Sequence, residues 1–259
     1  MEARADGEVT AYYVMDSGQL AAAAAAVAVV AFLYSSVGHA GASGYIASLT
    51  LLGFAPDAIK PTALVLNILV ASIGTYQFVR AGHFSWSLFW PFAVLAMPAA
   101  FLGGYVKLPA DVFKVLVGVV LLLSALRLLV RQGDPAETHA PPRGPAIILG
   151  GIIGLLSGLT GTGGGIFLTP LLMFAGWART KQAGATSVVF ILLNSMAGIV
   201  GHAAGGHGVP GIAWLLAVAA VVGGTVGSYL GSRKFPVRTV QVLLAVVLVI
   251  AGTKLVMLW

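Results

Sequence analysis

The sequence predicts an all-α integral membrane protein made of two inverted repeats, and three observations support this fold class. Hydrophobic residues make up 59% of the chain and charged residues only 8%, whereas a soluble domain carries roughly 25% charged residues. The chain is also duplicated, with Thr62 returning as Thr186 and other pairs recurring at the same spacing. Each half contains a glycine-rich interruption, at residues 38–44 and 158–165. Paired interruptions in an apolar, duplicated chain are typical of secondary transporters.

The order of segments divides the chain into four parts. They are an N-terminal tail at residues 1–17, a first transmembrane repeat at 18–131, a linker at 132–144 and a second transmembrane repeat at 145–259. The linker is predicted because prolines and polar residues replace the apolar runs there. The tail is acidic and lacks the basic start of a signal peptide, so we expect the first apolar run to remain as a membrane segment.

Each repeat is expected to contain five apolar segments. In the first repeat they cover residues 18–37, 43–54, 60–80, 85–106 and 111–131, and in the second 145–158, 163–175, 182–203, 209–231 and 237–258. The last three of each repeat are long enough to be transmembrane helices, which need about 20 apolar residues. The first two flank the glycine-rich interruption and form a helical hairpin. The two segments are arranged either as a re-entrant hairpin, with both ends on one side, or as a single broken crossing of the membrane.

The basic residues between segments favour the inverted arrangement. With re-entrant hairpins each repeat crosses the membrane three times, so the second repeat is upside down relative to the first. Nine lysine and arginine residues then lie on one side and five on the other, against eight and six for broken crossings with parallel repeats. The positive-inside rule therefore predicts inverted repeats of a multi-pass cell-membrane protein with both termini outside.

The positions of the acidic residues exclude several functions. All of them lie in the tail, at segment edges or in the linker, and none follows Glu137. A buried carboxylate is the usual cation ligand or proton relay of pumps, and hydrolysis by paired carboxylates or a catalytic triad also needs one. The chain has no cysteine, and its five histidines lack acidic or thiol neighbours. The sequence therefore predicts no enzyme, no metal and no cofactor, and the scattered basic residues predict no nucleic-acid partner.

The polar groups left in the membrane interior suit a small anion. Helices that begin near Gly44 and Gly164 would point free N–H groups at the interruptions, and a helix N-terminus binds anions without a formal charge. Hydroxyl groups would add donors, and His39 could donate to the anion or carry a proton. The predicted substrate-binding residues are Ser36, Gly38, His39, Gly41, Ser43, Gly44, Thr62, Asn67, Ser157, Gly158, Thr160, Gly161, Thr162, Gly163, Gly164, Thr186, Ser187 and Asn194.

Several of these residue types have a purely structural alternative. Glycines also let membrane helices pack closely, which is the expectation for the scattered Gly103 and Gly227, so Gly103→Ala is expected to be mild. The buried amide and hydroxyl side chains could instead form hydrogen bonds between helices. The repeated His83 and His207 lie at segment ends and are expected to be interfacial anchors.

Two stretches carry a resemblance to a known family. Residues 154–172, GLLSGLTGTGGGIFLTPLL, followed by Ala185-Thr186-Ser187, resemble the sulfite exporter TauE/SafE family of membrane permeases. Residues 36–45, SVGHAGASGY, are similar to the N-terminal motif of that family. The resemblance covers nearly the whole chain. It implies a plasma-membrane protein that moves small sulfur-containing or organic anions such as sulfite, sulfoacetate or thiosulfate.

These observations together predict a secondary transporter whose hairpin tips meet near the middle of the bilayer and bind a small anion. A sulfur oxyanion or an organosulfonate is the expected cargo, and export is the expected direction. Its partners are then the anion and the lipid bilayer, and homo-oligomerisation is left open. A passive anion channel and a non-transporting accessory membrane subunit are the alternatives.

Overall fold

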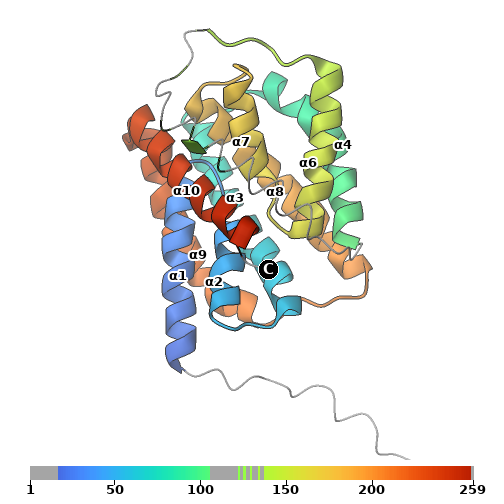
Figure 1. Cartoon of the computed structure of the whole chain (residues 1–259), viewed down its shortest axis with the longest axis vertical. Helices are drawn as coiled ribbons and strands as arrows, with labels where there is room; N and C mark the ends of the chain where they lie inside the picture. Colours follow the sequence, from blue (N-terminus) through green and yellow to red (C-terminus); the bar gives the residue numbers. More distant parts are fainter. Residues whose placement is uncertain are drawn as a thin grey trace, which may run out of the picture.

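The described part of the chain is helical throughout (Figure 1). The computed structural model describes residues 17–105 and 137–257, with residues 122, 125, 126, 129 and 134 between them. The predicted tail and nearly all of the predicted segment 111–131 lie outside the described residues. The elements are α1 (Ser17–Ser36), α2 (Ala42–Leu51), α3 (Pro56–Arg80), α4 (Trp86–Tyr105), α6 (Arg143–Thr160), α7 (Gly165–Phe174), α8 (Thr180–Ala204), α9 (Ile212–Tyr229), η1 (Leu230–Lys234) and α10 (Val237–Met257).

Six of the described helices are long and apolar enough to cross a membrane, which confirms the all-α membrane fold class. They are α1, α3, α4, α6, α8 and α9 continued by η1. From the sequence, transmembrane helices were expected only among the last three segments of each repeat. The structure therefore adds α1 and α6 to the candidate transmembrane helices. The predicted segment 145–158 is two residues short at each end, because α6 starts after Pro142 and continues to Thr160 before a left-handed Gly161 ends it.

Each short helix folds back along the long helix that precedes it. Near the open end of the first hairpin, Gln19 Nε2 donates to the Leu52 carbonyl at 2.6 Å. The second hairpin closes in the same way, where the His139 N–H donates to the Gly176 carbonyl at 3.0 Å. Both ends of each hairpin therefore lie at the same end of the molecule, and the glycine-rich interruption forms its tip. Each hairpin therefore turns back at its tip and does not continue in one direction, as a single broken crossing would.

Two rows of glycines, which we call glycine ladders, join the two halves of the chain. In each ladder a helix of one half packs against a helix of the other. Along each ladder the glycines recur every four residues, and a Cβ on any of them would overlap a carbonyl oxygen of the neighbouring helix. The pairs are Gly150 with Phe92, Gly154 with Ala96 and Gly158 with Ala100 between α6 and α4, and Gly223 with Ala28, Gly227 with Phe32 and Gly231 with Ser36 between α9–η1 and α1. Small residues allow this close backbone approach in membrane helices. The fourth helix of each half therefore packs on the first helix of the other.

Gly103 and Gly227 both take part in this packing. Their predicted role in helix contacts agrees with these positions, since Gly227 lies on the backbone of Phe32 and Gly103 on that of Leu155. The expectation that Gly103→Ala is mild is wrong, because the added Cβ would overlap the Leu155 carbonyl oxygen.

The two longest helices, α3 and α8, run antiparallel through the middle of the molecule. Leu64 lies against Gly198 and Gly74 against Val188, so residue numbers rise along one helix as they fall along the other. Between these contacts Asn67 Nδ2 donates to Ser195 Oγ at 3.3 Å. The hairpin tips lie on either side of this buried crossing.

Candidate functional site

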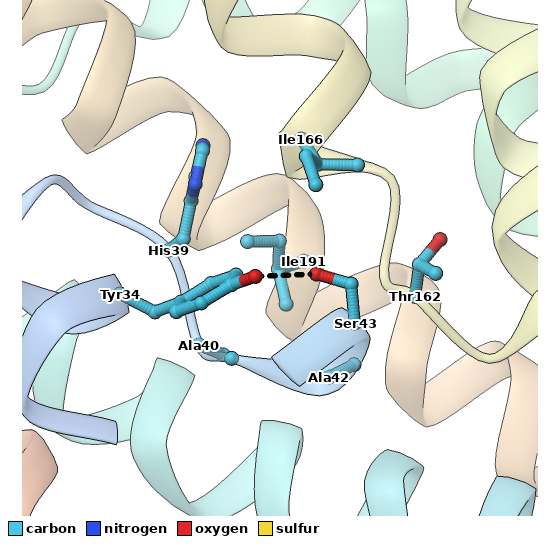
Figure 2. Close-up of a pocket in the computed structure, with 9 residues that line it drawn as sticks. Tyr34, His39, Ala40, Ala42, Ser43, Thr162, Ile166 and Ile191 are labelled. Atoms are coloured by element: carbon cyan, nitrogen blue, oxygen red, sulfur yellow. Dashed lines mark hydrogen bonds between the residues drawn. The ribbon is translucent and has the colours of Figure 1, made fainter. Parts of the chain in front are cut away.

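The two hairpin tips meet at one small cavity (Figure 2). Its volume is about 10 Å³, which is room for about one water molecule. The first tip provides most of the wall, the second tip provides two residues, and α8 closes the side. The lining residues are Tyr34, His39, Ala40, Gly41, Ala42, Ser43, Thr162, Ile166 and Ile191.

The end of α1 positions His39. The N–H of His39 donates to the Tyr34 carbonyl at 2.9 Å and that of Gly38 to the Ser35 carbonyl at 3.1 Å. Gly38 has a φ of +79°, so this is a Schellman motif with glycine in the left-handed position it requires. The motif ends the helix and leaves His39 in the chain that joins α1 to α2.

Side chains hold the first tip in place. Tyr34 Oη and Ser43 Oγ are 2.9 Å apart, as Figure 2 shows. Tyr45 Oη donates to the Ala40 carbonyl at 2.6 Å. The first N–H of α2, at Ala42, donates to Asn67 Oδ1 of α3 at 3.1 Å. An amide side chain from another helix therefore caps α2 where its own N-cap, a glycine, has no side chain to offer.

The second tip is built from glycine backbone. Gly161, Gly163 and Gly164 all have a positive φ, at +75°, +77° and +81°. Gly164 is the N-cap of α7 and supplies no capping side chain, so the first N–H groups of this helix face the tip without a cap. A Cβ on Gly163 would lie 2.7 Å from Ile191 Cγ2 and 2.8 Å from Asn67 Nδ2. The glycine is therefore needed both for the backbone turn and for contact with α3 and α8.

His39 connects the two tips. Its Nε2 atom lies 2.7 Å from Thr169 Oγ1 of α7, and that hydroxyl donates to Ser187 Oγ of α8 at 2.7 Å. The imidazole is only 2% exposed, and a Cβ on Gly165 would lie 3.3 Å from its Cδ2 atom. A polar chain thus runs from the first tip through the second short helix to α8.

Several buried polar atoms near the tips have no hydrogen-bond partner. They are His39 Nδ1, Thr62 Oγ1, Ser157 Oγ, Thr186 Oγ1 and both amide atoms of Asn194. Leaving a buried polar group unpaired costs about 1–3 kcal/mol, and such groups in a folded protein call for an explanation. One such explanation is that these atoms bind a ligand when the protein is in a different conformation.

Asn194 lies on the face of α8 that looks toward the second tip. It follows Phe190 by one helical turn, so the two side chains share a face. A Cβ on Gly164 would lie 2.9 Å from Phe190 Cε1 and 3.4 Å from Ser157 Cβ. Ser157 and Phe190 therefore both lie against Gly164, and Asn194 is one helical turn from Phe190.

The predicted site residues fall into four groups. Those that line the cavity are His39, Gly41, Ser43 and Thr162. Those joined to the tips by contacts are Asn67, Ser157, Gly161, Gly163, Gly164, Ser187 and Thr160, whose hydroxyl lies 2.9 Å from that of Thr162. Those in contact with neighbouring helices are Ser36, Gly38, Gly44 and Gly158. Those buried in α3 and α8 with unpaired side chains are Thr62, Thr186 and Asn194.

The residues that sequence reasoning missed in this region include three with polar side chains. Tyr34 lines the cavity, Thr169 bonds His39, and Ser195 bonds Asn67. A hydroxyl inside an apolar run is the signal that could have pointed to Thr169 and Ser195. Tyr34 has no such signal, because a tyrosine near a helix end is also typical of the membrane interface.

Comparisons with known proteins agree on a membrane transporter. The family model described as "Sulfite exporter TauE/SafE" matches residues 23–255. A probable membrane transporter protein, y4hK of Sinorhizobium fredii, is 44% identical over 238 residues, covering 89% of this chain and 95% of that protein. YunE of Bacillus subtilis, also named a probable membrane transporter protein, is 27% identical over 225 residues, covering 78% of this chain and 81% of YunE. No solved structure matches the chain.

Proposed function

The chain belongs to the sulfite exporter TauE/SafE family of membrane transporters, and on this premise we propose that it exports a small sulfur oxyanion or organosulfonate. The anion binds between the two hairpin tips. The family description names sulfite, and we include sulfoacetate and thiosulfate in the proposal as anions of related chemistry. The coarser assignment, a multi-pass membrane transporter, follows from the family and the six spanning helices.

One observation carries the proposal: interruptions from both halves meet at a single buried cavity. Its described lining offers hydroxyl, imidazole and backbone groups and no carboxylate. Uncapped N–H groups at the start of α7 face the same place. Helix N-termini of broken membrane helices bind anionic substrates in this way.

The cavity must widen before an anion can bind. Its volume of about 10 Å³ holds about one water molecule, whereas sulfite has four heavy atoms. The structure is therefore proposed to be a closed state, in which Thr162 and Ile166 of the second tip have moved against the first tip. Separation of the tips would expose Thr162, Ser43 and the N–H groups of α7 to the anion.

The proposed direction and topology follow from charge. When an anion leaves a cell with an inside-negative potential, its free energy falls by about 2.3 kcal/mol per charge per 100 mV. Export therefore needs no proton relay. Inverted repeats with both termini outside remain part of the proposal. The loop charges support it, as do the antiparallel α3 and α8 and the opposite directions of α1 and α6 in Figure 1.

Flux into proteoliposomes tests this function. Purified protein would be assayed with sulfite, sulfoacetate, thiosulfate and acetate under an imposed membrane potential. We expect saturable flux of at least one sulfur anion and faster flux when the same anion is loaded on the opposite side. Flux without this stimulation would indicate a channel, and no flux of any anion would indicate an accessory subunit.

A matched pair of threonine variants tests whether the flux depends on the hairpin tips. Thr162→Val removes a hydroxyl that lines the cavity, and Thr225→Val removes an exposed one on α9 that bonds its own helix. We expect Thr162→Val to lower the flux at least about fivefold and Thr225→Val to leave it unchanged. Equal flux in the two variants would contradict the site.

A further inference from the structure

A second and much larger hollow lies at one end of the molecule. Its volume is about 420 Å³, within the range of about 300–1,000 Å³ usual for small-molecule sites. It lies among the start of α3, the end of α4 and the end of α8, which meet at the lower right of Figure 1. We refer to it as the α3–α8 hollow, lined by Asp57, Lys60, Gly104, His202, His207 and Gly208 among others.

The chemistry of the α3–α8 hollow suits an anion. Lys60 supplies a positive charge, and the rings of His202 and His207 stack with their centroids 4.9 Å apart. His207 Nδ1 is buried and has no hydrogen-bond partner. Asp57 is exposed in the first turn of α3, whereas Lys60 is partly buried one turn further on. Of the two charged residues that line the hollow, Asp57 is therefore the more exposed and Lys60 the more buried.

The hollow leads to the second hairpin tip. A Cβ on Gly161 would lie 3.0 Å from Lys60 Cγ, so the stem of this lysine runs along the tip. A Cβ on Gly158, at the end of α6, would lie 2.8 Å from the N atom of Gly104. Two residues that line the hollow thus touch the second interruption directly.

The equivalent region at the other end of the molecule is arranged differently. In the duplicated sequence Gly184 corresponds to Lys60, and Gly82-His83 corresponds to Gly206-His207. The backbone of Gly184 packs against Gly38 of the first tip. His83 Nε2 lies 2.9 Å from the Ser232 carbonyl oxygen, and Lys181 Nζ donates to the same oxygen at 3.5 Å. His83 and Lys181 thus both contact η1.

We propose that the α3–α8 hollow is a loading site, separate from the cavity between the tips, where Lys60 and the two imidazoles hold a small oxyanion before it passes Gly161. This inference rests on the proposed function for the identity of the anion, a sulfite- or sulfonate-type species. It assigns a binding role to His202 and to His207, of which the latter was predicted from the sequence to be interfacial.

A cysteine introduced into the hollow tests the loading site. The chain contains no cysteine, so Gly208→Cys provides the only thiol, and a Cβ at Gly208 meets no atom within 4 Å. The rate of its modification by N-ethylmaleimide would be measured on the full-length protein, with sodium methanesulfonate or with sodium chloride at the same ionic strength. Methanesulfonate is the probe because sulfite itself adds to maleimides. We expect methanesulfonate to slow the modification at least about threefold through occupancy.

Two charge variants in the Gly208→Cys background identify the group that holds the anion. Lys60→Gln should abolish the protection by methanesulfonate, whereas Lys234→Gln, which removes an exposed lysine of η1, should retain it. In proteoliposomes without the cysteine, Lys60→Gln should raise the apparent KM for the transported anion about tenfold, with Vmax within about twofold.

The outcomes separate this inference from the proposed function. Flux of a sulfur anion without any protection of the introduced cysteine, or equal protection in Lys60→Gln and Lys234→Gln, would overturn the loading site and leave the transporter intact. Protection that depends on Lys60 in a protein that transports no anion would support the site and overturn the function.

Discussion

The tips of the two hairpins occupy equivalent places in the duplicated chain but are stabilised in different ways. Side chains hold the first tip, through the Tyr34–Ser43 and Tyr45–Ala40 hydrogen bonds and the cap that Asn67 gives α2. The second tip relies on left-handed glycines and on contact with α3 and α8. Duplication therefore preserved the path of the backbone while the means of holding it diverged.

This difference indicates a division of labour. A tip tied by side-chain hydrogen bonds to its own hairpin and to α3 resists displacement, because each bond contributes about 1 kcal/mol to the folded arrangement. A tip of glycines with uncapped N–H groups can change its backbone angles at little steric cost and can offer those groups to an anion. We expect the first tip to act as the fixed wall of the site and the second tip as the part that moves.

The largest expected effect tests the backbone of the second tip. Gly163→Ala should lower transport at least about 100-fold, which corresponds to about 2.7 kcal/mol in the barrier. The alanine would occupy a left-handed conformation at a cost of about 1–2 kcal/mol, and its Cβ would lie 2.7 Å from Ile191 Cγ2. Initial flux in proteoliposomes measures the effect.

Gly53→Ala is the matched control for backbone strain. Gly53 has a φ of +78°, nearly that of Gly163, and a Cβ there meets no atom within 4 Å. We expect a similar loss of stability and near-normal flux. A comparable fall of flux in both variants would show that strain alone, and not contact at the tip, explains the effect of Gly163→Ala.

The next effect separates function from stability in the buried amides. Asn194→Leu should raise the free energy of unfolding by about 1–3 kcal/mol, because both amide atoms are buried without partners. The same change should lower transport at least about tenfold if the amide meets the anion. Thermal unfolding in detergent, followed by tryptophan fluorescence, and flux measure the two quantities.

Asn67→Leu provides the contrasting result. Asn67 accepts from the Ala42 N–H and donates to Ser195, so its loss should reduce stability by about 1–2 kcal/mol. Destabilisation by both leucine variants would mean that Asn194 is structural, and its assignment to the site would then be abandoned.

A smaller effect tests the connection between the tips. His39→Leu and Thr169→Val each remove one partner of the 2.7 Å contact between imidazole and hydroxyl. Each should lower flux about tenfold, and the double variant should resemble the single ones, with an interaction energy of about 1 kcal/mol or more. Fully additive effects would show that the two residues act independently.

The smallest expected effect tests the fixed wall. Tyr34→Phe removes the hydrogen bond to Ser43 and should cost about 1 kcal/mol of stability, with less than about a threefold change in flux. Tyr105→Phe, at an exposed position of α4, is the control and should change neither quantity. A large loss of flux in Tyr34→Phe would move the tyrosine from the wall into the binding site.

Much of the fold could be predicted because its signals are local. An apolar run of about 20 residues can satisfy its backbone in a bilayer only as a helix, so composition predicts the long elements. Glycine clusters mark the tips for a comparable reason, since only glycine adopts the left-handed angles seen at Gly161 and Gly164 without a steric cost. The ends of α6 were harder to predict than its existence, because the helix continues through residues at which the sequence would equally allow it to break.

The arrangement of the site depended on contacts between distant residues. The pairs His39 with Thr169 and Asn67 with Ser195 are separated by 130 and 128 positions, and no local pattern records such a pairing. The choice of a hairpin that turns back over a broken crossing that continues likewise required the contact of Gln19 with Leu52. Composition and spacing were sufficient for a duplicated, apolar, helical chain with two uncharged interruptions. The structure was needed to show which interruption is tied by side chains and which end of the molecule holds a basic hollow. Both depend on how helices from the two halves pack together, because side chains acquire partners only in the folded protein.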